Sequence, residues 1–133
     1  MSTRATYEFQ ATKRIYRDGQ NWHDAPDITL YVHHDGYLAG AAAKLDFDGA
    51  ICTTAESFIR HNAKAEITDS HDSHGDTDFR YTVYWDDRGS RAQILAEKRY
   101  YANTEDNESG KDYWKPVFDG ALISFIIAYK PTS

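Results

Sequence analysis

Two segments near the N-terminus place apolar side chains at every second position. These are residues 4–11 (RATYEFQA) and residues 28–34 (ITLYVHH). A period of two residues is that of a β-strand with one buried face, because successive strand side chains point to opposite sides. We therefore predict an N-terminal antiparallel pair, with a turn at Asp18-Gly19 and residues 17–27 near its connection.

The second half of the chain has two further strand candidates. Residues 79–85 (FRYTVYW) place Phe79, Tyr81, Val83 and Trp85 on one face and Arg80, Thr82 and Tyr84 on the other. Residues 92–101 (AQILAEKRYY) are rich in strand-forming types. The turn residues 86–89 (DDRG) between them predict a hairpin.

The remaining non-helical segments are shorter or more polar. Residues 113–118 (YWKPVF) predict a short extended piece. Residues 66–78 (EITDSHDSHGDTD) predict a polar loop that is entered by a short extended piece around Ile67. Residues 103–112 (NTEDNESGKD) predict a charged loop.

Two helices are predicted in the first half of the chain. Residues 38–45 (LAGAAAKL) follow a turn at Asp35-Gly36, and Gly40 is expected to weaken this helix by about 1 kcal/mol relative to alanine. Its alanines would allow close packing on a sheet or on another subunit. Residues 53–63 (TTAESFIRHNA) begin with Thr53 or Thr54 as an N-cap and carry an apolar stripe.

A third helix is predicted near the C-terminus. Residues 119–129 (DGALISFIIAY) have apolar side chains at helical spacing, with Asp119 as the expected cap. Taken together, the elements predict an α+β fold: one domain over residues 1–133, with an antiparallel β-sheet and two or three helices packed on one face. A chain of 133 residues suits a single domain.

Charge and cysteine content narrow the classes of function. The formal net charge is −6, which argues against a duplex nucleic-acid partner, because such partners are bound through clustered Lys and Arg. The single cysteine, Cys52, cannot form an intrachain disulfide. The longest apolar run (ALISFIIAY) is too short to span a bilayer. We expect a cytoplasmic protein with no membrane partner.

The first candidate for chemistry is the loop 69–78. It carries two histidines and four aspartates: Asp69, His71, Asp72, His74, Asp76 and Asp78. Imidazole and carboxylate are suitable ligands for zinc or manganese. The spacing matches neither HExxH nor the calcium-loop pattern, so we favour a solvated turn and predict no metal.

The second candidate is the pair His33-His34. Adjacent strand residues point to opposite faces, so the two rings are not expected to ligate one ion. His33, on the polar face, could contact a ligand, whereas His34 is expected to pack or to cap the turn. Cys52 precedes a predicted helix but has no catalytic signature around it, and we expect it to be inert. No nucleophile elbow, P-loop or dinucleotide fingerprint is present, so we expect neither an enzyme nor a cofactor.

The third candidate is the interleaving of aromatic and basic residues in the second half of the chain. It occurs in residues 79–85, 90–101 (SRAQILAEKRYY) and 113–116 (YWKP). Aromatic rings stack on nucleobases, and arginine or lysine neutralises phosphates. For any one of these residues, a structural role in the sheet is equally open.

Several of these segments resemble a known family. In chain order, STRATYEF, LYVHHDGYLAGAA, AESFIRHN, AEITDSHDSHGDTDFRYTV and YWKPVFDGALISFI resemble the small phage-encoded anti-Thoeris sponge proteins. The similarity covers most of the chain, and none of its motifs is catalytic. The family's usual turn has proline where this chain has Leu38-Ala39, so the chain departs from the family pattern at the start of this helix.

The resemblance implies a non-catalytic role. Proteins of that family sequester the cyclic ADP-ribose isomers made by bacterial immune TIR enzymes and so keep the downstream effector silent. Some members are thought to hold cyclic oligonucleotides at a second site, and they assemble as dimers or higher homo-oligomers. For this chain the resemblance implies a cyclic nucleotide ligand, a homo-oligomer and the cytoplasm of a host bacterium.

Residue type and position then suggest a ligand-binding set. We expect Phe79 and Tyr81 to contact the base, and Arg91, Arg99 and Lys115 to contact the pyrophosphate. Arg60 could serve a second phosphate-rich site, and His33 and Tyr37 could border a pocket. Two alternatives stay open. One is a metal-dependent phosphodiesterase that uses loop 69–78, and the other is a protein-binding inhibitor of a host enzyme.

Overall fold

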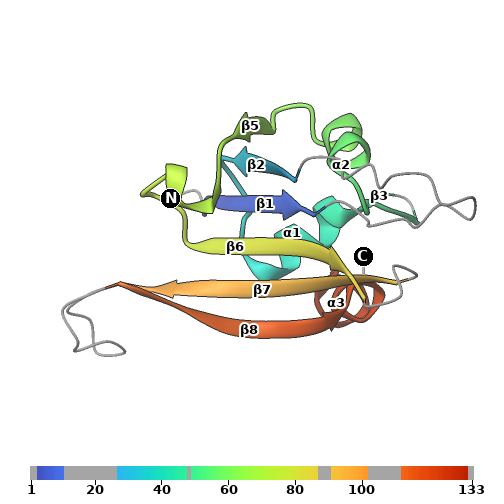
Figure 1. The fold of residues 1–133 in the computed structure, drawn as a ribbon. Helices are drawn as coiled ribbons and strands as arrows, with labels where there is room; N and C mark the ends of the chain where they lie inside the picture. Colours follow the sequence, from blue (N-terminus) through green and yellow to red (C-terminus); the bar gives the residue numbers. More distant parts are fainter. Residues whose placement is uncertain (1–2, 11–26, 48, 87–90, 102–111, 132–133) are drawn as a thin grey trace, which may run out of the picture.

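A six-stranded sheet is the frame of the structure, which is a computed structural model describing residues 3–10, 27–47, 49–86, 91–101 and 112–131 (Figure 1). The strand order is β5-β2-β1-β6-β7-β8. The strands are β1 (Ala5–Phe9), β2 (Ile28–Val32), β5 (Glu66–Thr68), β6 (Phe79–Trp85), β7 (Ala92–Tyr100) and β8 (Tyr113–Ala121). A separate two-stranded ribbon pairs β3 (Asp46–Phe47) with β4 (Ala50–Ile51).

The sheet is mixed, which corrects the prediction of a purely antiparallel one. The predicted pair of β1 with β2 and the predicted hairpin of β6 with β7 are both antiparallel, as expected. However, β1 and β6 run parallel, with Tyr7 opposite Tyr81. The 69 residues between the end of β1 and the start of β6 include two helices, and parallel neighbours require a long crossover of this kind.

Three helices contribute to one hydrophobic core. They are α1 (Leu38–Leu45), α2 (Ala55–His61) and α3 (Leu122–Tyr129), and Figure 1 shows α1 and α3 together behind the sheet. Ala41, Phe58 and Phe125 are fully buried, in one cluster with Tyr7 and Tyr81 of the central strands. The predicted α+β class, with helices on one face of a sheet, is therefore confirmed.

The predicted N-cap of α2 is confirmed, whereas that of α3 is wrong. Thr54 caps α2: its hydroxyl accepts a hydrogen bond from the Ser57 backbone N–H at 3.1 Å. Asp119 does not cap α3, because β8 continues through Ala121 and the helix begins only at Leu122. Asp119 instead accepts a hydrogen bond from the Tyr84 hydroxyl at 2.6 Å, which joins β8 to β6 across the intervening β7.

The turn at Asp35-Gly36 is fixed by close backbone contacts. Asp35 adopts a positive φ of 53°, and the Gly36 N–H donates to the Thr3 carbonyl at 2.9 Å. A Cβ at Gly36 would lie 2.7 Å from the Ala5 Cβ. A Cβ at Gly40 would lie only 2.1 Å from the Asp35 carbonyl oxygen. Gly40 is thus required for α1 to pack on the turn, which the helix propensity of glycine does not reveal.

Some predictions fall outside the described residues. These are the turn at Asp18-Gly19, most of the connection 17–27, turn residues 87–89 and nearly all of the loop 103–112. Over the described parts of the chain, no helix has the length and apolar character needed to cross a membrane.

Replacing Gly40 by alanine tests the packing of α1 on the turn. Helix propensity alone predicts that Gly40→Ala stabilises the protein by about 1 kcal/mol. The 2.1 Å approach to the Asp35 carbonyl predicts the opposite, a loss of about 1–3 kcal/mol in the free energy of unfolding. Urea denaturation measures the difference. Gly75→Ala is the matched control, because a Cβ there meets no atom within 4 Å, and its stability should stay within about 0.5 kcal/mol of the wild type.

Candidate functional site

Five aromatic and basic side chains lie on one face of the sheet, at the end where β6 begins. Register places Phe79 opposite Lys98, Lys98 opposite Lys115, and Tyr100 opposite Tyr113. Directly paired residues point to the same side of a sheet, so three strands contribute to one surface. We refer to Phe79, Lys98, Tyr100, Tyr113 and Lys115 as the strand-end platform.

The rings of the strand-end platform are ordered by stacking. Tyr100 and Tyr113 stack with centroids 5.2 Å apart and planes 10° apart, and the Lys98 ammonium lies 5.6 Å from the Tyr100 centroid. Phe79 stacks on the buried Tyr81 ring at 6.1 Å and 7°. Phe79 therefore packs against the core, and Tyr100 and Tyr113 pack against each other.

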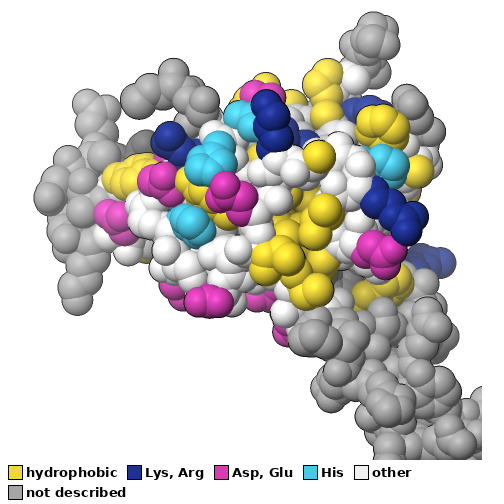
Figure 2. Space-filling model, turned by 90° about the horizontal axis from the view of Figure 1, so that it is seen from above, with side chains coloured by type: hydrophobic (Ala, Val, Ile, Leu, Met, Phe, Trp, Pro, Cys, Tyr) yellow, Lys and Arg dark blue, Asp and Glu magenta, His cyan; other side chains and the backbone are white. Residues whose placement is uncertain are grey.

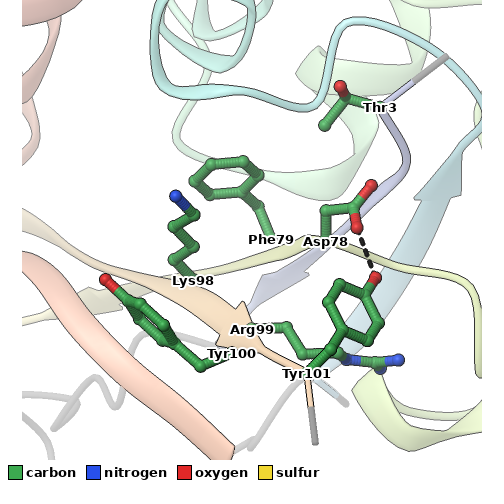
Figure 3. A pocket seen from close by; sticks show the side chains of 7 residues that line it. All are labelled: Thr3, Asp78, Phe79, Lys98, Arg99, Tyr100 and Tyr101. Atoms are coloured by element: carbon green, nitrogen blue, oxygen red, sulfur yellow. Dashed lines mark hydrogen bonds between the residues drawn. The ribbon is translucent and has the colours of Figure 1, made fainter. Parts of the chain in front are cut away.

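A pocket of about 340 Å³ adjoins the strand-end platform. Figure 3 shows Phe79 and Lys98 side by side at its wall, with Tyr100 below them. The acidic residue of the wall, Asp78, accepts a hydrogen bond from the Tyr101 hydroxyl. Burial, followed by this hydrogen bond, raises the pKa of Tyr101 to about 12. Tyr101 thus stays neutral at physiological pH and holds the Asp78 carboxylate.

The two lysines give the strand-end platform its charge. Within the parts of the chain that the structure describes, neither the Lys98 nor the Lys115 ammonium has an acidic partner within 4 Å. Like charges directly opposite one another across two strands destabilise a sheet. A bound anion would relieve that repulsion, so the arrangement suits a negatively charged ligand with an aromatic part.

Arg99 borders the same pocket but is directed elsewhere. Its guanidinium donates to the Gly75 carbonyl at 2.6 Å and to the Thr77 hydroxyl at 3.2 Å. It also lies 4.7 Å from the Trp114 ring. Figure 3 shows the group pointing away from Lys98. In this conformation Arg99 holds the loop that precedes β6 and does not extend the basic surface.

The other predicted ligand residues do not join the strand-end platform. Tyr81 is fully buried, and its hydroxyl donates to the Gly36 carbonyl at 2.6 Å, so it belongs to the core. Arg91 is exposed at the far end of β7. Of the eight predicted residues, Phe79 and Arg99 line the pocket and Lys115 adjoins it through register.

Arg60, His33 and Tyr37 lie on other surfaces. Arg60 is exposed and pairs with Glu56 at 2.7 Å along α2. On the face of α2 and β5 seen in Figure 2, basic side chains are scattered among acidic and histidine side chains. The His33 ring lies 3.2 Å from a Glu66 carboxylate oxygen, and Tyr37 precedes α1 with 46% of its surface exposed.

Sequence reasoning missed Lys98, Tyr100 and Tyr113. The segments that contain them were identified as aromatic and basic, but the individual residues were not selected. The available signal was the unbroken runs of aromatic and basic residues at 98–101 (KRYY) and 113–115 (YWK). Combining the two strands requires the register, which includes a bulge between Ala96 and Glu97.

The histidine and aspartate loop is a clamp on the other face of the sheet. The His71 ring bonds to the Thr6 hydroxyl at 2.6 Å through Nδ1 and to the Thr82 hydroxyl at 3.1 Å through Nε2. The His74 ring stacks on Tyr31 with centroids 3.8 Å apart. The predicted solvated turn fits the exposed Asp69, Asp72 and Asp76, whereas the two histidines depart from it. The loop forms the short 3-10 helix η1 (His71–Ser73), and both histidine rings contact the sheet.

The same loop does not assemble a metal centre among the residues described. There, no group of three His, Cys, Asp or Glu side chains is arranged to hold a metal ion. Both nitrogens of His71 are already engaged with threonine hydroxyls. Asp76 accepts from the Tyr31 hydroxyl at 2.9 Å and lies 3.4 Å from Arg4. The contacts of the loop are structural.

Two further predicted sites can be placed. Cys52 is 1% exposed, and burial raises the pKa of its thiol, so it is not an activated nucleophile. His34 was expected to pack or to cap the turn, but it is exposed and lines a separate pocket together with Lys44.

Comparisons of the chain with protein-family models, curated proteins and solved structures found no significant match.

The His71 clamp predicts a specific dependence of stability on pH. Burial lowers the pKa of His71 below the ordinary histidine value, with the nearby Arg80 acting in the same direction and Glu8 opposing it. The unfolded chain therefore binds a proton more readily, and this contribution to stability is complete above about pH 6.5. It is lost as the pH falls from there toward the lowered pKa. Urea unfolding at pH 8, 7, 6 and 5 measures it.

His71→Gln isolates this contribution, because the substitution removes the titrating group. The free energy of unfolding of the wild type should fall more steeply below about pH 6.5 than that of His71→Gln. The pH 8 measurement supplies the baseline difference between the two proteins. Parallel profiles over the whole range would contradict the role of the buried imidazole.

Proposed function

We propose that this protein is a non-catalytic sequestrant of a small cyclic nucleotide signal, which it binds at the strand-end platform. The observation that carries the proposal is the placement of Lys98 and Lys115, without an acidic partner among the described residues, beside the stacked Tyr100 and Tyr113. A nucleotide combines a planar base with phosphate charge. Aromatic rings recognise the first and lysines the second.

The class of signal comes from the resemblance to the anti-Thoeris sponge proteins. A cyclic ADP-ribose isomer contains one adenine and one pyrophosphate, so it needs a ring surface and a pair of cations close together. Phe79 and Tyr100 would contact the base, and Lys98 and Lys115 would contact the pyrophosphate. On this proposal the protein lowers the free signal by binding it in the cytoplasm of a host bacterium and so inhibits an antiphage defence.

Sequestration needs no reacting group at the strand-end platform. Asp78, the acidic residue that lines the pocket, is held by Tyr101, and the buried Cys52 does not line it. The metal-dependent phosphodiesterase that was considered from loop 69–78 gains no support, because its histidines bond to threonine side chains. The residues of the strand-end platform account for ligand binding and require no catalytic step.

A protein contact has its own supporting observation on α3. Ile123 is 49% exposed and Ile127 is 76% exposed, one helical turn apart on the side of α3 away from the buried Phe125 and Ile126. A pocket of about 330 Å³, lined mainly by apolar side chains, adjoins Ile123. We therefore propose that α3 contacts a second copy of the chain, as homo-oligomers of the resembled family would require. A host protein is the alternative partner.

Substitution of the two lysines tests the strand-end platform. The wild type should gain thermal stability with at least one cyclic ADP-ribose isomer, because a ligand of the native state raises its apparent stability. Lys98→Gln should weaken binding by roughly 10- to 100-fold, the equivalent of about 1.5–3 kcal/mol for a charged hydrogen bond. Isothermal titration calorimetry measures the affinities.

Arg91→Gln is the matched control, because Arg91 is an exposed cation at the opposite end of β7. Its affinity should remain within twofold of the wild type. Unchanged binding by a Lys98→Gln/Lys115→Gln double variant would overturn the site. Mass analysis of ligand released on heating tests the absence of turnover separately, since recovery of a cleaved product would contradict sequestration and leave the site standing.

Charged substitutions on α3 test self-association. The wild type should show a mass above that of a monomer by light scattering. Ile123→Glu/Ile127→Glu should be monomeric, because a carboxylate at each position disfavours burial of that surface. Ile67→Glu is the control: Ile67 is 72% exposed on the edge strand β5, and its substitution should leave the mass unchanged. A monomeric wild type would contradict the proposed homo-oligomer and would favour a host protein as the partner of α3.

A further inference from the structure

The described residues that line a second pocket include basic side chains and no acidic ones. It has a volume of about 320 Å³ and lies where α1 and α2 end. Its basic residues are His34, Lys44, His61 and Lys64, and Asn62 lies among them. We call it the helix-end pocket. Such a concentration of basic groups is notable in a chain with a net charge of −6, because the average surface of that chain repels anions.

Lys44 is the most informative member of the helix-end pocket. Its side chain is only 11% exposed, and burial lowers the pKa of its ammonium, with Asp35 opposing that effect. Its contacts are long: 3.5 Å to the Asp35 carbonyl and 3.9 Å to the Asp35 carboxylate. An ammonium group has three donors. It therefore retains capacity for a further acceptor on the pocket side.

The walls of the helix-end pocket are held together by hydrogen bonds. The Asn62 side-chain amide donates to the Lys44 carbonyl at 3.2 Å and to the Phe58 carbonyl at 2.9 Å. This bridge fixes the end of α2 against the end of α1. The basic residues consequently come from three separate segments whose relative positions are set by the fold. His34 follows β2, Lys44 lies in the last turn of α1, and Lys64 follows α2.

We infer that the helix-end pocket binds a small phosphate-bearing anion, independently of the strand-end platform. Lysines bind phosphate as point charges, and histidines add ring N–H donors. Within the described chain, the ammonium of Lys64 and the rings of His34 and His61 have no acidic partner within 4 Å. A volume of about 320 Å³ is at the lower end for small-molecule sites and suits an anion the size of a sugar phosphate.

The helix-end pocket is chemically distinct from the strand-end platform. Among the described residues, its lining contains no Phe, Tyr or Trp. Its rings are the imidazoles of His34 and His61, and the His61 ring is already stacked on Phe47 with centroids 4.4 Å apart. The platform combines rings with lysines. The helix-end pocket should therefore select the phosphate group itself, whereas the platform should require a planar base as well.

Titration calorimetry with the full chain tests the inference. The probes are inorganic phosphate and ribose 5-phosphate, each measured against sodium chloride at equal ionic strength. We expect one bound anion per chain for at least one phosphate probe and none for chloride. The two probes distinguish a site for free phosphate from a site for a phosphate ester. Absence of a phosphate-specific signal with both probes would overturn the inference.

Variants locate the bound anion. Lys64→Gln, at an exposed position, should weaken phosphate binding at least about fivefold, as expected for loss of one charged contact. Lys44→Gln should weaken it further, and where its folding is impaired, His61→Gln provides the second measurement. Arg60→Gln is the matched control on α2, because Arg60 pairs with Glu56 and does not line the pocket.

Lys98→Gln separates the two sites and should leave phosphate binding within twofold of the wild type. Loss of phosphate binding in Lys98→Gln, together with unchanged binding in Lys64→Gln, would assign the anion to the strand-end platform and overturn the second site. This outcome would not affect the proposed function, which is tested with nucleotide ligands.

Discussion

The buried contact between the Tyr81 hydroxyl and the Gly36 carbonyl joins the two halves of the fold. It is 2.6 Å long and links the centre of β6 to the turn that precedes α1. The same turn bonds to the Thr3 backbone just before β1. Its position therefore fixes where α1 begins relative to the two central strands. A buried hydroxyl without a partner would cost about 1–3 kcal/mol, so the phenol and the carbonyl constrain each other.

This contact also supports the strand-end platform from within the core. Tyr7 stacks on Tyr81 with centroids 5.0 Å apart, and Tyr81 in turn stacks on Phe79. The first two rings are fully buried, and the third reaches the pocket. A ligand ring that packs on Phe79 would meet a surface already immobilised by its neighbours. Such preorganisation reduces the entropy lost on binding.

The two faces of the sheet are covered by different means. Apolar helices cover one face, whereas a polar loop covers part of the other. Tyr31 shows the consequence. It belongs to the polar face of β2 yet is only 2% exposed, because the His74 ring stacks on it and the Asp76 carboxylate accepts a hydrogen bond from its hydroxyl. The histidine and aspartate residues that suggest a catalytic or metal site in the sequence here cover the polar face of β2. Each of these polar groups has a partner, as burial requires.

Sequence periodicity was sufficient for the strands but not for their arrangement. Alternation of apolar side chains identified β1, β2 and β6, and strand-forming composition identified β7, although Thr6, Thr29 and Tyr31 on the other face of β1 and β2 are buried as well. It carries no information on which strands are neighbours, and so the parallel pairing of β1 with β6 was missed. Asp119-Gly120 resembles a helix start, yet pairing with Leu95 and Ile94 keeps these residues in β8. Pairing with β7 therefore outweighs the local preference of Asp119-Gly120 for a helix start.

The candidate sites show the same limit at the level of single residues. Tyr81 and Phe79 are two positions apart on one strand and share a face. Tyr81 is fully buried and packs on Phe125 of α3, whereas Phe79 lines the pocket. Tertiary packing decides this difference, and no spacing within β6 encodes it. Lys98 and Lys115 are likewise brought together only by register. In an acidic chain, each such meeting of cations leaves a repulsion that an anion can relieve, and this gives the strand-end platform and the helix-end pocket a shared physical basis for binding. What separates them is the set of phenyl and phenol rings at the first, whereas the described lining of the second has only histidine rings, so one chain can hold two anions of different chemistry.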